Sequence, residues 1–466
     1  MTKLHDKLFE PINLVDKTGG MTPDQIGNVI GGNFGSKYAS TPEGFDWPES
    51  LPEVIAYKNG DFYDCNIKPE DLIDFSQFTN TLYVDINRPN SSGDGSSWSL
   101  AEKGLSEAID TAISSGLPTR ILVRGGVYPR VYSFGSLAKT LTAPICIEAV
   151  YGRVTTGPFD FLTYSQNGTY PTVYEVARSS VQQCIDPSRT ENGKPLRLTG
   201  VQSILECSET AGSFYTDDVN FYVHPFGSEP ATEKNTLPVL NARNSEFFAS
   251  NNDFYIRGFD LIGGSVGCAK FRSGSTNKVI IDSCSAIYSM SGDYGSESTT
   301  DGFVVLDCGL FAAFDSEASY NSKDGFNFHE NSGVIPSGLL VNCCGYSNGE
   351  LLSGLSCNGV TAHDGVKLID IGGEWLGSIG TNAGHVSDDT QVWHFGSVAG
   401  DSDGDVYNGG SIDYGAFGVW SGAAEMWLDS CRSVGSIVSV KASGTANAYV
   451  RDMSGTGEYS GNVSEY

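Results

Sequence analysis

The chain has 466 residues, with 28 Lys or Arg against 56 Asp or Glu, so its formal net charge at pH 7 is −28. A surface this acidic repels phosphate backbones and anionic lipids, so we expect neither nucleic-acid binding nor membrane insertion. No run approaches the roughly 20 apolar residues of a membrane-spanning helix, and the first residues lack the apolar core of an export signal. We therefore expect synthesis in a cytoplasm without an export signal of its own.

The composition favours a fold of many short strands. Glycine is frequent at 57 residues, charged residues make up only 18%, and there are 24 Phe and 22 Tyr, a mixture typical of strands joined by tight turns. Cys284, Cys308 and Cys343 each end an apolar run, which predicts reduced thiols in the core rather than a disulfide framework. No Cys-x-x-Cys pair or histidine cluster has metal-ligand spacing, so we predict no metal site.

Residues 1–80 differ from the rest of the chain. They are rich in Gly and Pro, show little periodicity and contain only a short polar strand pattern near "YKNGDFYD". We interpret them as a separate amino-terminal region that is better suited to docking on a partner than to catalysis.

The clearest helix of the sequence follows a "YVD" strand. Ser99 and Glu102 have the spacing of a capping box, and Gly116 with Pro118 ends the helix. The next stretch, "RILVRGGVY", has the pattern of a buried strand followed by a turn. One face of the predicted helix is apolar and comprises Leu105, Ala108, Ile109, Ala112 and Ile113.

A repeat appears further along, where Asp-Gly precedes an apolar residue at Asp301, Asp324 and Asp364. The offsets, 324 − 301 = 23 and 364 − 324 = 40, indicate stacked supersecondary units. In each copy we expect the Asp-Gly pair to form a turn that tolerates positive φ, with a strand after it.

Superposing the three copies predicts which side chains share a face. Phe303, Phe326 and Val366 then point into a core, together with the apolar residues two positions later. Asp307, Glu330 and Asp370 share one outer position. Because neighbouring strands lie roughly 4.8 Å apart, we expect the carboxyls of Asp307 and Glu330 to lie near one another on the surface.

The "YVD" strand, the Gly/Asp/Ser/Trp loop after it, the amphipathic helix and the "ILVRGGVY" strand resemble the opening of pectate-lyase-like parallel β-helix proteins. "FYIRGFDLIGG", "NKVIIDSCSAIYS" and "GLLVNCCGYSNG" look like successive coils of that fold. The resemblance implies an all-β, right-handed parallel β-helix over residues 81–435, with an amino-terminal capping helix. Residues 1–80 would then form a small attachment region, and residues 436–466 a short carboxy-terminal strand region.

The segments "DGFNFHENSG", "TAHDGVKLIDIGGEW" and "GHVSDDTQVWHFG" are more particular, since they look like the β-helix of bacteriophage tailspikes and capsule depolymerases. That resemblance implies a homotrimer in the virion tail, joined through its amino-terminal region to a phage tail or baseplate protein. It also implies binding and cleavage of a bacterial surface polysaccharide, namely a capsule, an exopolysaccharide or an O-antigen.

Candidate site residues cluster between positions 324 and 394, which hold four of the six histidines together with many carboxylates. Glycosidic hydrolysis needs two carboxyls across the scissile bond, and sugars also stack on aromatic faces. The predicted catalytic residues are Glu330, Asp364, Glu374 and His363. The predicted substrate-binding residues are Asp324, His329, His385, Asp388, Trp375 and Trp393.

Each candidate also has a structural interpretation. Asp324 and Asp364 precede glycines and can simply form turns. His329 can be an ordinary strand residue, Glu374 can mark a bulge, and the tryptophans can be packing residues. Asp388 can belong to a solvated loop.

Two other functions stay open on the sequence alone. A polysaccharide lyase would use His329 or His363 as its base, with Ca²⁺ neutralising a uronate carboxylate, whereas the favoured hydrolase needs no cofactor. A non-catalytic adhesin would bind the polymer without cutting it. The sugar, its linkage and the stereochemical outcome do not follow from the residues.

Overall fold

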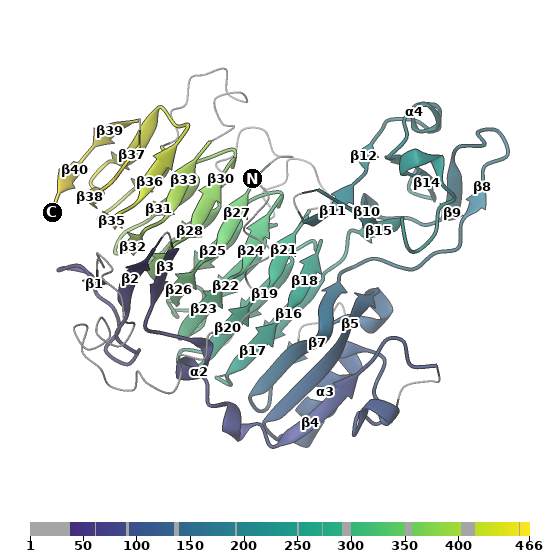
Figure 1. Ribbon diagram of the computed structural model, residues 1–466, viewed down its shortest axis with the longest axis horizontal. Helices are drawn as coiled ribbons and strands as arrows, with labels where there is room; N and C mark the ends of the chain where they lie inside the picture. Colours follow the sequence, from purple (N-terminus) through teal and green to yellow (C-terminus); the bar gives the residue numbers. More distant parts are fainter. Residues whose placement is uncertain are drawn as a thin grey trace.

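The computed structural model describes residues 38–60, 62–89, 93–134, 139–191, 193–248, 251–272, 274–290, 300–349, 357–401, 415–455 and 457–466. Most of these residues form a right-handed parallel β-helix, which confirms the predicted fold class. In its regular part each turn of the solenoid supplies three strands, which stack in parallel on the strands of the next turn (Figure 1). We call these three stacks of strands the first, second and third columns.

The first column is a ten-stranded sheet. Its strands are β6 (Lys139–Thr140), β16 (Ser245–Phe248), β19 (Ala269–Arg272), β22 (Phe303–Leu306), β25 (Phe326–His329), β28 (Val360–Ala362), β31 (Ala383–Val386), β34 (Phe417–Trp420), β37 (Val438–Ser443) and β39 (Glu458–Gly461).

The second and third columns complete each turn. The second comprises β4 (Asn80–Val84), β5 (Thr119–Tyr128), β7 (Ile145–Thr156), β17 (Phe254–Arg257), β20 (Lys278–Asp282), β23 (Leu310–Phe314), β26 (Ser337–Val341), β29 (Lys367–Ile371), β32 (Gln391–Phe395), β35 (Glu425–Asp429), β38 (Asn447–Arg451) and β40 (Val463–Glu465). The third comprises β18 (Phe259–Ile262), β21 (Ser285–Ile287), β24 (Glu317–Ser319), β27 (Cys344–Tyr346), β30 (Glu374–Leu376), β33 (Val398–Gly400) and β36 (Arg432–Val434). The strands β37–β40 within residues 436–466 therefore continue the stacks of the solenoid.

The register between β22 and β25 confirms the first part of the predicted repeat. Phe303 pairs with Phe326, and Leu306 pairs with His329. The rings of Phe303 and Phe326 lie 5.0 Å apart inside the solenoid, because alternate side chains of a strand point to the same face. Cys284, Cys308 and Cys343 are buried in the same core, and all 11 cysteines of the chain are free, as the sequence predicts.

The predicted third copy of the repeat is wrong. Phe326 pairs with Val360 of β28, so the strand of Val366 and Asp370 is not the next strand of the first column. Asp364 lies instead in the turn between β28 and β29. The true repeat unit is Asn358-Gly359-Val360, where asparagine replaces the aspartate, so that a search for Asp-Gly misses it.

Close packing between turns, not positive φ, explains the glycines of the first two copies. A Cβ atom on Gly325 would lie 2.4 Å from the carbonyl oxygen of Gly359, and one on Gly302 would lie 2.8 Å from that of Gly325. The predicted positive φ is wrong for Asp301 and Asp324, and correct for Asp364, whose φ is 60°. The glycines let consecutive turns hydrogen-bond through their backbones, for example from Gly302 N–H to the Asp324 carbonyl at 2.8 Å.

The predicted helix is present as α3 (Leu105–Ser115), and Gly116 ends it in the left-handed conformation. Its apolar face packs in the main core, beside β4 and β5. The predicted capping box is wrong, because Gly104 is the residue at the N-cap and Glu102 instead accepts a hydrogen bond from Thr111 at 2.9 Å. A role for α3 as the cap of the solenoid stays a prediction.

The described part of the amino-terminal region packs along the solenoid. It contains β1 (Tyr38–Ser40), β2 (Ile55–Asn59), β3 (Phe62–Cys65), α2 (Pro69–Leu72) and the short helix η2 (Phe75–Gln77). These elements cover apolar side chains on the outer face of the second column, among them Leu339, Ile371 and Phe395. In Figure 1 this region lies against β26 and β32 as the dark purple segment.

Residues 158–242 form an insertion that the sequence analysis did not predict, and they project to the right of the solenoid in Figure 1. A small core of their own, which includes Phe214, Phe221 and Val223, stabilises them. Their elements are β8 (Ser165–Gln166), β9 (Tyr174–Ala177), β10 (Val181–Glu191), β11 (Lys194–Arg197), β12 (Thr199–Gly200), α4 (Ile204–Glu209), β13 (Ser213–Thr216), β14 (Asn220–His224), η5 (Phe226–Ser228) and β15 (Leu237–Leu240).

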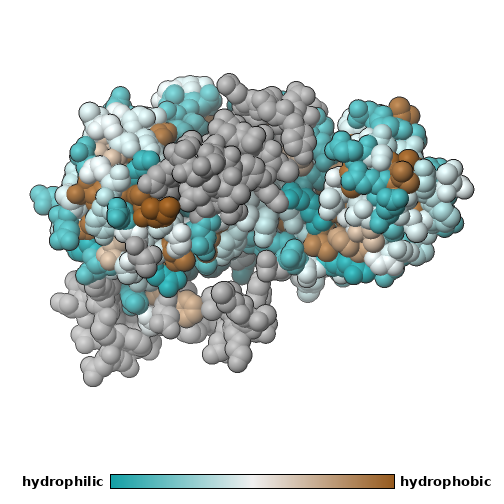
Figure 2. Space-filling view, turned by 90° about the horizontal axis from the view of Figure 1, so that it is seen from above, coloured by the Kyte–Doolittle hydropathy of each residue, from teal (hydrophilic) through white to brown (hydrophobic). Residues whose placement is uncertain are grey.

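The distribution of hydrophobic side chains over the surface is consistent with the acidic composition of the chain. On the face seen in Figure 2, hydrophobic side chains of the described residues form small, separate groups among hydrophilic ones. No helix within the described ranges is both long and apolar enough to cross a membrane.

Candidate functional site

The most promising group of side chains lies where β25 and β28 end. His329 is the last residue of β25, and its Nδ1 lies 3.1 Å from Oδ2 of Asp364 in the turn after β28. The side chains of His329 and Asp364 are 29% and 40% exposed, so a ligand can reach both. Because a carboxylate only accepts hydrogen bonds, this contact places the imidazole proton on Nδ1 and leaves Nε2 free to accept a proton.

His363 completes this group. Its ring stacks on that of His329 with the centroids 4.0 Å apart and the planes 15° apart. Burial lowers the pKa of His363 to about 3, and the neighbouring His329 contributes to the lowering. His363 is therefore neutral at physiological pH, and it presents a polar, uncharged ring beside the His329–Asp364 pair.

Two carboxyls lie beside this group, that of Glu330 directly after His329 and that of Asp307 one turn of the solenoid earlier. The sequence predicts that they lie near one another, but the expected surface position is wrong for Asp307, which is buried. The two residues directly follow the paired residues Leu306 and His329. Burial raises the pKa of Asp307 and the charge of Glu330 raises it further, against a hydrogen bond from Asn331 and the charge of Arg272. The Asn331 side-chain amide donates to Asp307 Oδ2 at 2.6 Å. Asp307 thus favours its protonated form more than an ordinary aspartate does.

Asp388 lies one turn further along the same edge of the solenoid. It is exposed in the turn between β31 and β32, which is stacked next to the turn of Asp364. Its Oδ1 accepts a hydrogen bond at 2.8 Å from the backbone N–H of Ala423 in the following turn. The edge thus gathers five of the predicted site residues, and we call this group the histidine–carboxylate edge. Its members are Asp307, His329, Glu330, His363, Asp364 and Asp388, of which Asp307 was predicted only as the neighbour of Glu330.

The predicted role of Trp375 and His385 in substrate binding is wrong, because both are fully buried inside the solenoid. Trp375 Nε1 donates to Asp370 Oδ2 at 2.8 Å. His385 Nε2 lies 2.9 Å from Nε2 of His394, whose Nδ1 lies 2.7 Å from the same Asp370 oxygen. Asp370 was expected on the surface, yet its carboxylate is the buried centre of this network.

Trp393 is also buried, for a different reason. It belongs to β32 of the second column and lies in the cluster that residues 39–78 cover. A sugar therefore cannot stack on it, and the predicted substrate-binding role is wrong. Nothing in the sequence around Trp393 indicates that a segment more than 300 positions earlier covers it.

Asp324 is buried as well, so its predicted contact with substrate is wrong. Its Oδ1 accepts a hydrogen bond from Asn358 N–H at 2.8 Å, and its own N–H donates to Asp301 Oδ1 at 3.1 Å. Burial and the charge of Asp301 raise the pKa of Asp324 above its ordinary value. Asp324 links three consecutive turns of the solenoid.

Glu374 is exposed but does not join the histidine–carboxylate edge. It begins β30 in the third column, where its neighbours are Cys344 of β27 and Val398 of β33. Its charge acts on Tyr346, whose pKa is raised by burial, by Cys344 and by Glu374. The structure therefore brings Glu330 and Asp364 to one edge and places Glu374 on another face.

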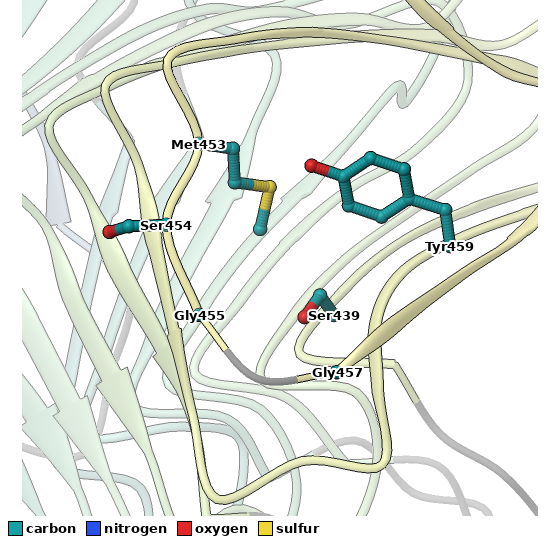
Figure 3. Close-up of a pocket in the computed structure, with 6 residues that line it drawn as sticks. All are labelled: Ser439, Met453, Ser454, Gly455, Gly457 and Tyr459. Atoms are coloured by element: carbon teal, nitrogen blue, oxygen red, sulfur yellow. The ribbon is translucent and has the colours of Figure 1, made fainter.

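Two other features bear on ligand binding. Within the described residues, no group of three or more His, Cys, Asp or Glu is arranged to hold a metal ion. A pocket near the carboxy terminus has a volume of about 170 Å³ and is lined by Ser439, Met453, Ser454, Gly455, Gly457 and Tyr459. In Figure 3 the Tyr459 ring and the Met453 side chain face one another across this pocket, which offers no carboxylate or imidazole for acid–base chemistry.

No protein-family model and no curated protein matches the chain. Among solved structures, a glycoside hydrolase matches with 8% identity and a TM-score of 0.46, over 83% of this chain and 96% of that one. The pectate lyase Pel9A matches with 14% identity and a TM-score of 0.38, over 83% and 78%. The tailspike protein gp49 from Pseudomonas phage LKA1 matches with 9% identity and a TM-score of 0.28, over 77% and 70%. At such identities the likeness concerns the parallel β-helix fold alone.

Proposed function

We propose that this protein is a polysaccharide depolymerase that hydrolyses glycosidic bonds at the histidine–carboxylate edge. The observation that carries the proposal is the contact of His329 with Asp364 at 3.1 Å, beside the carboxyls of Asp307 and Glu330. Acid–base groups with different protonation preferences converge here on an accessible edge of a long solenoid. Such an edge suits an extended polymer that runs across several turns.

The two carboxyls have the different environments that glycoside hydrolysis needs. Asp307 retains 8% exposure, against 2% for Asp324, and its pKa is raised, which suits a general acid that protonates the departing sugar oxygen. Glu330 is more accessible, and we assign it the part of the base or nucleophile. The rest of the edge then binds and orients the sugar on either side of the scissile bond.

His329 and His363 support this arrangement in different ways. Asp364 holds Nδ1 of His329, so in the neutral ring Nε2 is the nitrogen that can accept a proton from the ligand. His363 stays neutral, so it contributes hydrogen bonding without repelling a developing positive charge on the sugar ring.

A lyase is the second candidate, and the same histidine–aspartate pair favours it. A His329 base oriented by Asp364 can remove the proton next to a uronate carboxylate. That reaction also requires a positive group to neutralise the uronate. Two cations act on this edge, since the charge of Arg272 lowers the pKa of Asp307 and that of Lys323 lowers the pKa of His363, whereas the hydrolase needs no such group.

The biological setting belongs to the same proposal. We propose that the protein acts as a homotrimeric phage tailspike on a bacterial capsule, exopolysaccharide or O-antigen, with its amino-terminal region joined to a tail or baseplate protein. Sedimentation equilibrium of the purified full chain tests the assembly. A mass of three chains supports it, and a monomer at micromolar concentration contradicts it.

The deciding experiment for the reaction is mass spectrometry of bacterial surface polysaccharides after incubation with the purified protein. Oligosaccharides that carry an added water establish hydrolysis. Fragments with an unsaturated, dehydrated end establish the lyase instead. If the polymer binds and stays intact, the protein is an adhesin and the proposed hydrolysis is wrong.

A further inference from the structure

A second site lies where the insertion 158–242 leaves and rejoins the solenoid. Arg130 follows β5 in the short helix η4 (Arg130–Tyr132), while Asp160 and Arg178 belong to the insertion. The two arginines line a pocket of about 210 Å³, which is separate from the histidine–carboxylate edge. The pocket is lined by Arg130, Arg178, Ser179, Ser180, Leu240, Asn241 and Ala242.

Backbone hydrogen bonds hold the walls of this pocket together. Arg130 N–H donates to the Phe159 carbonyl at 2.7 Å, and Asn241 N–H donates to the Ser180 carbonyl at 2.8 Å. These contacts join the outgoing strand, the returning strand and the solenoid. The pocket is therefore a fixed feature of the junction rather than a gap between independent parts.

The pocket carries an excess of positive charge. Arg178 Nη2 lies 2.6 Å from Asp160 Oδ2, and Arg130 Nε donates to Asp160 Oδ1 at 3.2 Å. Two guanidinium groups thus share one carboxylate, which leaves a local charge of 2 − 1 = +1. In a chain of net charge −28, an anion experiences less repulsion at such a place than the net charge implies.

The two arginines also retain hydrogen-bond donors. A guanidinium has five N–H groups, and Asp160 can satisfy only part of the ten. Arg178 Nε is buried and has no hydrogen-bond partner among the described residues. A buried, unsatisfied donor costs free energy that an oxyanion in the pocket would recover, and Ser179, Ser180 and Asn241 add polar groups to the same wall.

We propose that this pocket binds the carboxylate of an acidic sugar within the polysaccharide substrate. The returning strand leads from Ala242 directly into β16, which lies three strands before β25 in the first column. Three steps of about 4.8 Å place the pocket about 14 Å along the axis from the strand of His329. The pocket lies before the strands of the first column and the histidine–carboxylate edge lies after them, so an extended polymer that crosses this column obliquely can occupy both sites. The identity of the polymer rests on the proposed function, whereas the anion site does not.

The test measures binding in a variant that should cut its ligand at a strongly reduced rate. Calorimetric titration of the Asp364→Asn protein is carried out with a uronate-containing oligosaccharide, a neutral oligosaccharide of equal length and inorganic phosphate. We expect the uronate oligosaccharide to bind more tightly than the other two. Arg178→Gln in the same background should weaken that binding about tenfold or more, since a charge-assisted hydrogen bond is lost.

Arg189→Gln is the matched control, because Arg189 lies in the same insertion but pairs with Asp186 and Glu229 outside the pocket. Should Arg178→Gln fail to fold, Arg178→Lys keeps the charge and loses only the planar fork, so it should also weaken binding. The inference is overturned if either folded Arg178 variant binds the uronate ligand unchanged, or if phosphate binds and the uronate ligand does not. If the anion binds as expected but the wild-type protein cuts no polymer, only the proposed function fails.

Discussion

Asp364 has two structural roles, one through its backbone and one through its side chain. Its backbone has φ 60°, a region that non-glycine residues seldom adopt and that aspartate and asparagine tolerate best, and its carboxylate contacts His329. The residue that makes the turn is therefore also the residue that orients the imidazole. The sequence left a turn and a catalytic role open for Asp364; the structure shows the turn and the contact with His329, and the catalytic role stays a prediction.

The variant Asp364→Asn separates the backbone role of this residue from its side-chain role. Asparagine keeps the size of the side chain and tolerates the left-handed turn, but it removes the charge that fixes the His329 tautomer. We expect cleavage of the polysaccharide to fall about a hundredfold or more with little change in melting temperature. Reducing-end release and thermal unfolding measure the two effects.

Glu374→Gln is the control for that prediction, because Glu374 is also an exposed carboxylate but lies in the third column. We expect it to retain the wild-type rate. Wild-type cleavage by Asp364→Asn, or an equal loss in both variants, would show that the histidine–carboxylate edge is not the site.

Asp307 gives the pH dependence of the proposed hydrolysis. Its pKa is raised in the folded chain, and a general acid works only in its protonated form. The rate should therefore decline as the pH rises through the raised pKa of Asp307, and Asp307→Asn should abolish that decline together with most of the activity. A profile of kcat/KM against pH tests this. An alkaline limb that persists in Asp307→Asn would assign it to another group.

At the scale of single elements, the turns before the first column are held by buried polar side chains. Asp301, Asp324 and Asn358 occupy equivalent positions in consecutive turns, and Asp324 is hydrogen-bonded to both neighbours. Glycines follow all three because the turns stack too closely for a Cβ atom. These turns fix the register of β22, β25 and β28 and hence bring Glu330 beside Asp307.

The buried pair Asp301–Asp324 makes stability depend on pH. An aspartate in the unfolded chain loses its proton near pH 4, whereas Asp324 keeps its proton to higher pH in the fold. Between these two pKa values the folded state binds more protons, so the free energy of unfolding declines as the pH rises. Asp324→Asn stays neutral, and we expect it to flatten this decline between about pH 4 and pH 8.

Denaturant unfolding at a series of pH values measures this effect. Asp388→Asn is a suitable comparison, because Asp388 is an exposed turn aspartate and should leave the pH dependence unchanged. If the free energy of unfolding of Asp324→Asn declines as steeply with pH as that of the wild type, the Asp301–Asp324 pair does not control the pH dependence of stability.

At the scale of the whole molecule, the amino-terminal region is part of the packed structure. Phe45 meets Trp427 with ring centroids 5.8 Å apart, and Tyr63 meets Phe395 at 5.5 Å. The outer face of the second column is apolar, and residues 39–78 remove it from water. A role in attachment to a partner stays a prediction, but the region also has a stabilising role.

Removal of residues 1–80 should therefore destabilise the solenoid. The deletion exposes an apolar outer face that includes Ile369, Ile371 and Trp393, so we expect a lower melting temperature and aggregation. Tyr63→Ala is a milder version, with an expected loss of about 1–3 kcal/mol. Light scattering and thermal unfolding report the outcome, and a truncated chain as stable and monodisperse as the parent would contradict the packing argument.

The sequence by itself determined the repeating strands, the buried thiols, the apolar helix face and the juxtaposition of Asp307 with Glu330. These features depend on local alternation and on neighbouring copies of the repeat, which can be superposed directly. The third copy was misplaced because asparagine stands where the pattern required aspartate at position 358.

Only the tertiary structure decided which of the candidate residues are accessible. Trp375 and His385 face the interior, and a distant segment covers Trp393. The side chain of His329, in contrast, is 29% exposed, so histidines of the same cluster in the sequence differ in exposure. The contact between His329 and Asp364, and the meeting of Arg130 with Arg178, likewise join strands and loops that are far apart in the chain. Long-range packing sets these distances, and no local pattern of side chains encodes them.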